Sequence, residues 1–119
     1  MTPPRPSDAL LPLKPLVFQV LLTLATDDQH GYAIVQDIAR RTAARLRLRP
    51  GNLYHALKLM LDAGLIEESD RRPAPDLDDE RRRYYRITRF GRRTAAAEAE
   101  RLQALVADAK AARLFKART

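Results

Sequence analysis

The chain of 119 residues is long enough for one globular domain, and its composition, 45% hydrophobic and 31% charged, excludes a disordered chain. Twenty-two Lys and Arg side chains against fifteen Asp and Glu give a net charge of +7, which favours an anionic partner. The absence of cysteine excludes disulfides, zinc–thiolate sites and thiol nucleophiles.

Prolines dominate the start of the chain, where five of the eight lie in the first fifteen residues and predict a flexible arm over residues 1–12. From Pro15 the apolar residues recur at helical spacing, so we expect a first helix that runs to about Thr26. Pro15 suits the first turn of that helix, where its missing N–H is no loss. Residues 27–29 then predict a loop.

Two further helices are expected within the next forty residues. The second begins at Gly31, after His30. Basic and apolar residues alternate over residues 45–49, and this short stretch favours a connector rather than a strand of a sheet. Pro50 starts the third helix, again at a favoured first-turn position, and Gly64 is expected to be its C-terminal cap.

The hydrophobic period changes after the third helix. Residues 65–69 and 83–87 are short strand candidates, and the polar, proline-broken segment between them predicts a hairpin loop. Thr88 is expected to cap a long, alanine-rich last helix that continues to about Phe115. The sequence therefore predicts a mainly α fold with a small β-hairpin.

Three helices followed by a β-hairpin describe a winged helix-turn-helix, in which the third helix enters the DNA major groove and the hairpin, or wing, carries cations beside the phosphates. We assign this domain to residues 13–88 and a C-terminal dimerisation helix to residues 89–119. Residues 65–80 hold two basic and seven acidic side chains, a net of −5, whereas residues 81–93 hold seven arginines and no acid. The positive field is therefore local and directed.

The start of the third helix combines a cation, an exposed backbone and a side-chain amide, which suit phosphate and base contacts. Lys58 is expected to reach a phosphate or guanine O6/N7, and Asn52 to reach an adenine edge. Taken one at a time, these residues have structural alternatives, with Asn52 as a helix cap or Tyr54 as a ring packed on the domain. The candidate DNA-binding residues of this helix are Arg49, Gly51, Asn52, Tyr54, His55 and Lys58.

Arginines also cluster around the hairpin. Their position on its return strand favours phosphate or minor-groove contact over the commoner fate of a charged triplet, which is a solvated run. Arg92 and Arg93 are expected to solvate the last helix or to pair with its acids. The candidate DNA-binding arginines of the hairpin are Arg71, Arg72, Arg82 and Arg83.

Features of an enzyme, a cofactor site or a membrane protein are missing from the sequence. His55 has no Ser, Thr or carboxylate at a triad spacing, and His30 is expected to cap or to pack. Residues 78–80 lack the regularity of metal ligands and no phosphate-binding glycine loop is found, so we expect no metal and no cofactor. Without a membrane span or a signal peptide, we expect a soluble, cytoplasmic protein with no membrane partner.

Four linked motifs stand out along the chain: residues 30–34 (HGYAI), 50–58 (PGNLYHALK), 64–67 (GLIE) and 77–88 (LDDERRRYYRIT). Together they resemble the PadR family of bacterial regulators. The resemblance implies a dimeric winged-helix transcription factor of the compact branch, usually a repressor released by a small molecule. Asn52 stands where the family usually has Thr or Ser, and its common Arg-Leu-Glu stretch is Leu-Met-Leu here.

The last helix carries a stripe of small and aliphatic residues at three- and four-residue spacing. We expect this stripe to pair two protomers rather than to fold back on its own core, because the winged-helix domain already has its own helices to bury. The stripe consists of Ala95, Ala99, Leu102, Leu105, Val106, Ala109 and Ala112. The expected dimer contacts are Leu102, Leu105, Val106, Ala109 and Leu114.

The sequence as a whole predicts a homodimeric, sequence-specific DNA-binding transcriptional regulator on a palindromic operator in double-stranded DNA. We expect a repressor that a small-molecule effector relieves, although no residue pattern identifies the chemistry of that effector. The alternative is a winged-helix adaptor that binds another protein without sequence-specific DNA binding. An enzyme has no supporting feature in the sequence.

Overall fold

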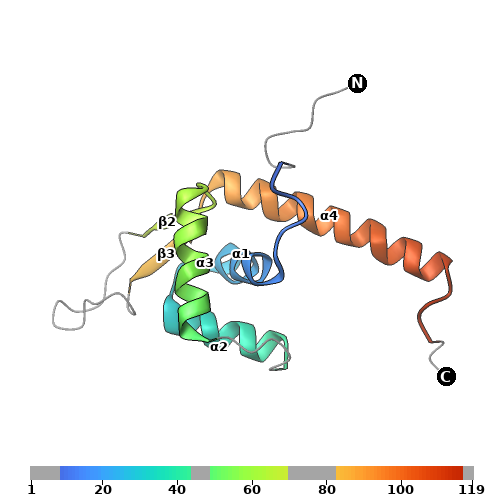
Figure 1. Cartoon of the computed structure of the whole chain (residues 1–119), viewed down its shortest axis with the longest axis horizontal. Coiled ribbons are helices and arrows are strands. Elements are labelled where there is room, and N and C mark those ends of the chain that lie inside the picture. Colours follow the sequence, from blue (N-terminus) through green and yellow to red (C-terminus); the bar gives the residue numbers. More distant parts are fainter. Residues whose placement is uncertain (1–8, 44–48, 70–82, 117–119) are drawn as a thin grey trace.

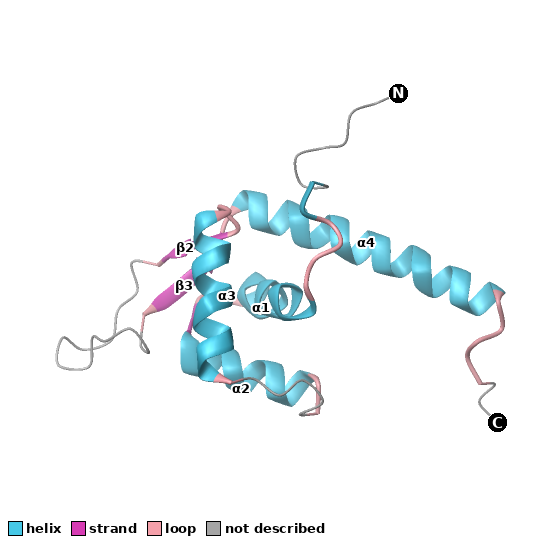
Figure 2. Ribbon diagram, in the orientation of Figure 1, coloured by secondary structure: helices cyan, strands magenta, loops and turns pink. Residues whose placement is uncertain are grey.

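The computed structural model of the chain describes residues 9–43, 49–69 and 83–116. It is mainly helical with a small antiparallel sheet, as the sequence predicts (Figure 1, Figure 2). The elements in chain order are α1 (Pro15–Thr26), β1 (Gln29–His30), α2 (Gly31–Arg41), α3 (Pro50–Asp62), β2 (Ile66–Glu68), β3 (Tyr84–Ile87) and α4 (Arg89–Ala111).

The sheet contains a third strand that the sequence analysis did not predict. The strand order is β1–β3–β2 with both pairs antiparallel, and β1 places Gln29 opposite Tyr85 and His30 opposite Tyr84. A strand of two residues is too short to show an alternation of polar and apolar side chains, so only its pairing with β3 defines it. Through β1 the hairpin is attached to the start of α2.

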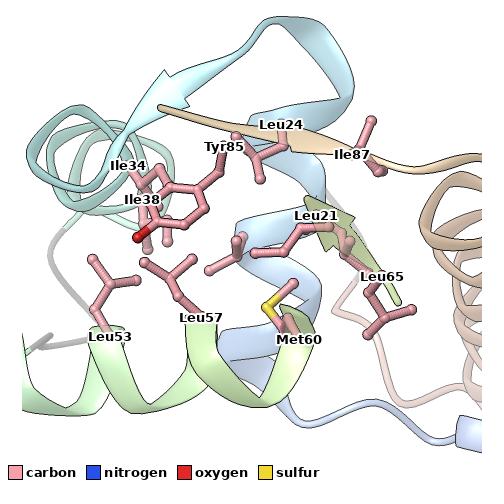
Figure 3. Packing of buried hydrophobic residues seen from close by; sticks show 12 residues of the cluster. Leu21, Leu24, Ile34, Ile38, Leu53, Leu57, Met60, Leu65, Tyr85 and Ile87 are labelled. Carbon is pink, nitrogen blue, oxygen red and sulfur yellow. The ribbon is translucent and has the colours of Figure 1, made fainter. Parts of the chain in front are cut away.

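The hydrophobic core lies where α1, α2 and α3 meet the sheet (Figure 3). α3 contributes one side of its surface to this cluster, so its opposite side is left for solvent or a partner. The labelled members of the cluster are Leu21, Leu24, Ile34, Ile38, Leu53, Leu57, Met60, Leu65, Tyr85 and Ile87.

A tight turn links α3 to β2, as the glycine in the sequence predicts. Gly64 has a positive φ of 77°, which glycine adopts without a steric penalty. The Leu65 N–H donates to the Met60 carbonyl at 2.9 Å and the Gly64 N–H to the Leu61 carbonyl at 3.1 Å, the two bonds of a Schellman motif. This motif ends α3 and directs the chain at once into the hairpin.

The start of α4 is fixed on that same turn. Thr88 caps the helix as predicted, because its Oγ1 accepts the Gly91 N–H at 2.9 Å. Gly91 lies so close to the turn that a Cβ atom there would be 2.0 Å from the Leu65 carbonyl oxygen. The direction of α4 is therefore coupled to the end of α3.

Two polar groups connect α1 and its leading segment to the other helices. Asp37 of α2 accepts the Thr23 hydroxyl at 2.7 Å and the Arg41 Nε at 2.9 Å. The hydrogen bond from Thr23, followed by the contact with Arg41, holds the pKa of Asp37 below its usual value despite partial burial. Glu98 of α4 accepts the Leu13 N–H at 2.7 Å. Residues 1–8 of the expected arm lie outside the described residues.

The last helix is shorter than predicted, since it ends at Ala111 and not near Phe115. Arg113 takes a left-handed conformation with φ of 60°, and the Leu114 N–H donates back to the Ala109 carbonyl at 3.0 Å. This is the same kind of helix stop as at Gly64, but a non-glycine residue makes it. The alanine-rich sequence contains no glycine or proline that would have revealed it.

None of the helices in the described part of the chain has the length and apolar character needed to cross a membrane.

Candidate nucleic-acid interface

One side of α3 presents polar side chains to solvent at three- and four-residue spacing. Asn52, His55 and Lys58 are all exposed, as expected from their positions off the apolar stripe. Leu59 lies on the same side and is 45% exposed, although the sequence analysis did not select it. Its position seven residues after Asn52 and four after His55 is the signal that would have found it. The exposed side of α3 therefore offers an amide, an imidazole, an ammonium group and one aliphatic surface.

The first turn of α3 is capped by backbone rather than by Asn52. Arg49 is the N-cap residue, and its carbonyl accepts the N–H groups of Asn52 at 2.9 Å and Leu53 at 3.2 Å. Pro50 has no N–H, so Gly51 is the only one of the first four helical residues whose amide can reach a phosphate. Gly51 is exposed, and a Cβ atom built there meets nothing within 4 Å. The side chain of Asn52 therefore does not cap the helix, which was the structural alternative to a base contact.

Tyr54 takes the structural alternative named for it, a ring packed on the domain. Its side chain is half-buried and packs against the hydrophobic core. A Cβ atom on Gly31 would come within 3.2 Å of the Tyr54 hydroxyl oxygen, so the ring lies across the first residue of α2. The reason is the position of Tyr54 next to Leu53 and Leu57, at the edge of the buried side of α3. Tyr54 therefore packs α3 against the first residue of α2.

A groove separates the exposed side of α3 from the hairpin. Its volume is about 420 Å³. It brings together Lys58 of the helix and Arg83 beside β3, which are candidate residues far apart in the sequence. The lining residues are Tyr54, His55, Leu57, Lys58, Leu61, Glu68, Arg83 and Tyr85.

The hairpin carries two cross-strand ion pairs on opposite faces. Tyr85 is buried and lies opposite Glu68, so Glu68 and Arg83 share the face that looks toward α3. On this face Arg83 Nη1 is 3.0 Å from Glu68 Oε1. Arg86 lies opposite Glu67 on the other face, and its Nε is also 3.0 Å from the Glu67 Oε1. Arg83, a candidate DNA-binding residue, is therefore paired with Glu68, which was not among the candidates.

Three of the predicted DNA-binding arginines cannot be placed. Arg71, Arg72 and Arg82 lie outside the described residues. Within the described ranges, no group of His, Asp and Glu side chains has the arrangement of a metal site. His30 takes the role expected of it, since its Nδ1 accepts the Ala33 N–H at 3.1 Å as the N-cap of α2.

Four of the five expected dimer contacts lie on the half of α4 that projects away from the other helices (Figure 1). Leu105 is 50% exposed and Val106 is 43% exposed, while Leu102 and Ala109 are half-buried. Leu114 follows the end of the helix and is also largely exposed. The side chains within the helix share one face, which the described rest of the chain leaves partly exposed.

The beginning of that same face is buried and contains a carboxylate that the sequence analysis missed. Glu98 is 2% exposed, and it accepts the Leu13 N–H and an ion-pair contact from Arg101 one turn later. Arg101, and then the Leu13 N–H, lower the pKa of Glu98 against the effect of burial. Its position four residues before Leu102 and seven before Leu105 is the signal that would have found it, because this spacing places Glu98 on the face of the apolar stripe.

Three helices, a paired hairpin and an exposed polar side on the third helix define a winged helix-turn-helix protein. The model of the transcriptional regulator PadR-like family matches residues 20–97, which extend from within α1 through α2, α3 and the sheet into α4. The chain belongs to this family. It is thus a transcriptional regulator and not an enzyme, as the motifs in the sequence predicted.

Solved structures of other proteins share this fold. A transcriptional regulator from Clostridium thermocellum is 23% identical with a TM-score of 0.66, over 85% of this chain and 90% of that one. A PadR-like transcriptional regulator from Bacillus cereus is 19% identical with a TM-score of 0.68, over 85% and 93%. Bacillus subtilis PadR in complex with operator DNA is 20% identical with a TM-score of 0.60, over 72% of this chain and 47% of that one. No curated protein sequence matches the chain significantly.

Proposed function

We propose that this regulator is a homodimer that binds a palindromic operator in double-stranded DNA, with α3 in the major groove and the hairpin beside the phosphates. The observation that carries the proposal is the exposed side of α3, where His55 and Lys58 line one groove together with Arg83 and Asn52 is exposed one turn earlier. An amide and a cation on one helix face are the groups that read adenine and guanine edges. The net charge of +7 supplies attraction to phosphates that does not depend on sequence.

The homodimer is proposed from the uncovered face of α4. Leu105 and Val106 lie on a helix that continues past the core, and an isolated chain leaves both about half exposed to water. A second copy of α4 covers them by two-fold symmetry. Two protomers then present two α3 helices, which fits half-sites about 34 Å apart, one turn of DNA.

The direction of regulation rests on the resemblance to the family. Family members are usually repressors released by a small molecule, and we extend both properties to this chain as part of the proposal. The terminal helices at the dimer interface are the place proposed for the effector. A chromosomal target also implies action in the cytoplasm.

The test is selection of bound duplexes from random DNA, carried out with wild type and with Lys58→Ala and Asn52→Ala variants. We expect each variant to relax base preference at a defined position, at a cost of about 1–3 kcal/mol for each bidentate pair of hydrogen bonds that is removed. Lys14→Ala is the matched control, since Lys14 is exposed at the start of α1 and lies on neither α3 nor the hairpin.

A protein that selects no sequence, and whose weak DNA binding lacks a steep salt dependence, would instead be the winged-helix adaptor for another protein. A variant that loses affinity for all sequences alike would show that its side chain contacts only the backbone.

A further inference from the structure

We propose that Glu68 limits the DNA affinity of this protein by holding Arg83, so that a DNA phosphate must compete with a carboxylate of the protein itself. The inference rests on the proposed function and names a residue that regulates it. Arg83 Nη1 is 3.0 Å from Glu68 Oε1, and both residues line the groove between α3 and the hairpin. Arg83 is thus already engaged by an anion on the side of the hairpin that faces α3.

The Arg83–Glu68 ion pair lies in the exposed groove and not in the core. Side chains alternate along a strand, so Arg83 and Glu68 share the face of Tyr85, while Glu67 and Arg86 take the other. Tyr85 is buried at the inner end of this face, whereas the Arg83 and Glu68 side chains are 48% and 43% exposed. The ion pair lies at the solvent edge of the groove, across from Lys58.

Competition at this position follows from elementary electrostatics. A phosphate that approaches Arg83 meets a guanidinium whose charge is largely neutralised by Glu68, and it meets the negative charge of Glu68 as well. An exposed ion pair is weak enough for a phosphate to displace it, and strong enough to lower affinity by a measurable factor. Because a phosphate contact carries no base information, Glu68 reduces binding to every sequence alike.

The second ion pair of the hairpin provides a matched control. Arg86 Nε and Glu67 Oε1 are also 3.0 Å apart, with side chains 44% and 52% exposed, and they belong to the same two strands. Neither residue lines the groove. Glu67→Gln and Glu68→Gln therefore remove the same charge from the same hairpin and differ only in the face that they change.

The experiment measures binding of the full chain to a duplex of random sequence over a range of salt concentrations, with circular dichroism to show that each variant is folded. We expect Glu68→Gln to raise affinity roughly two- to fivefold for each protomer that engages the DNA. The gain should shrink as salt rises, because salt screens the interaction between Arg83 and the phosphate. Glu67→Gln should give a gain of less than half that size.

The Arg83→Gln background identifies the route of the effect. If Glu68 acts through Arg83, Glu68→Gln gains little or nothing once Arg83 is absent. A gain that persists in Arg83→Gln, an equal gain in Glu67→Gln, or an unchanged affinity in Glu68→Gln would each overturn the inference while DNA binding stands. If neither wild type nor any variant binds a duplex, the proposed function itself fails and this inference with it.

Discussion

The two halves of α4 share one face and differ in what covers it. In the first half the face consists of Gly91, Thr94 and Glu98, all buried against the rest of the domain. In the second half it consists of larger aliphatic side chains such as Leu105 and Val106, which are about half exposed. The polar and small residues are thus buried while the aliphatic ones face solvent.

This distribution is the reverse of what an isolated chain would favour. Burial of Glu98 requires the Leu13 N–H and Arg101 as partners, whereas Leu105 and Val106 would gain free energy from burial without any specific partner. The first half of α4 therefore contributes to the fold of one chain, and the second half is suited to a contact between chains. The family model also ends within α4, at residue 97, close to where the burial changes.

The largest effect is expected from charges on the uncovered half. The double variant Leu105→Asp and Val106→Asp removes two aliphatic side chains from each protomer, and so four from the proposed dimer. The free energy of dimerisation should weaken by about 4 kcal/mol or more, which is roughly a thousandfold in the dissociation constant. Operator affinity should fall by orders of magnitude, because each protomer then grips one half-site alone. Sedimentation measures the first effect and DNA titration the second.

The matched control is Ala104→Asp with Ala107→Asp, which adds the same two charges to exposed positions on the other side of the helix. That variant should remain a dimer. A folded dimer in the Leu105 and Val106 variant would place the interface on another surface.

A smaller but still large effect is expected from the packed half. Gly91→Ala would put a Cβ atom 2.0 Å from the Leu65 carbonyl oxygen, a contact with backbone that no side-chain rotation relieves. We expect a loss of about 3 kcal/mol or more in the free energy of unfolding. Chemical denaturation measures it, with Gly51→Ala as the control, because a Cβ atom at Gly51 meets nothing within 4 Å. Equal stability of both variants would show that α4 does not approach Leu65 so closely.

Local chemistry explains why most of the fold was predictable from the sequence. Pro15 and Pro50 mark the first turns of two helices, Gly64 marks the end of one, and Thr88 caps another, each by a property of its own residue type. The stop at Arg113 was missed because a left-handed non-glycine residue leaves no compositional signal. Strand β1 was missed because only its pairing with β3 defines it.

The site was predictable in its outline and not in its pairings. Helical spacing identified the exposed positions of Asn52, His55 and Lys58, since an apolar stripe also defines the side that it leaves free. Spacing did not reveal that Tyr54 packs on Gly31, because both the buried and the exposed side of a helix border such a position. The ion pair of Arg83 with Glu68 depends on strand register, which the sequence does not specify across a long loop.

The buried carboxylate of the packed half should make stability depend on pH. Glu98 has a lowered pKa in the folded chain, so its contribution is complete above the ordinary value of 4.5 and is lost as pH falls through the folded value. Asp37 adds a loss of the same sign. Glu98→Gln should cost about 1 kcal/mol at neutral pH and should flatten the decline of stability with acid. Denaturant unfolding of both proteins between neutral and acidic pH measures this difference, and parallel curves would contradict it.

The smallest effect compares two left-handed helix ends. Ala43 ends the packed helix α2 with φ of 52°, and Arg113 ends the projecting half of α4 with φ of 60°. Glycine adopts this conformation without the strain, but it also has greater conformational freedom in the unfolded chain. The net effect of a glycine here is a gain of about 0.5 kcal/mol in the stability of the folded state. Ala43→Gly should therefore raise the free energy of unfolding, because α2 unfolds together with the core.

Arg113→Gly should behave differently in a monomeric background that carries Leu105→Asp and Val106→Asp. There the end of α4 frays independently of the core, so the substitution should increase helix content and leave the free energy of unfolding unchanged. In the dimer the same substitution should raise the midpoint of thermal unfolding, because the partner couples the end of α4 to the fold. Equal gains from Arg113→Gly in monomer and dimer would show that the second half of α4 belongs to the core of a single chain after all.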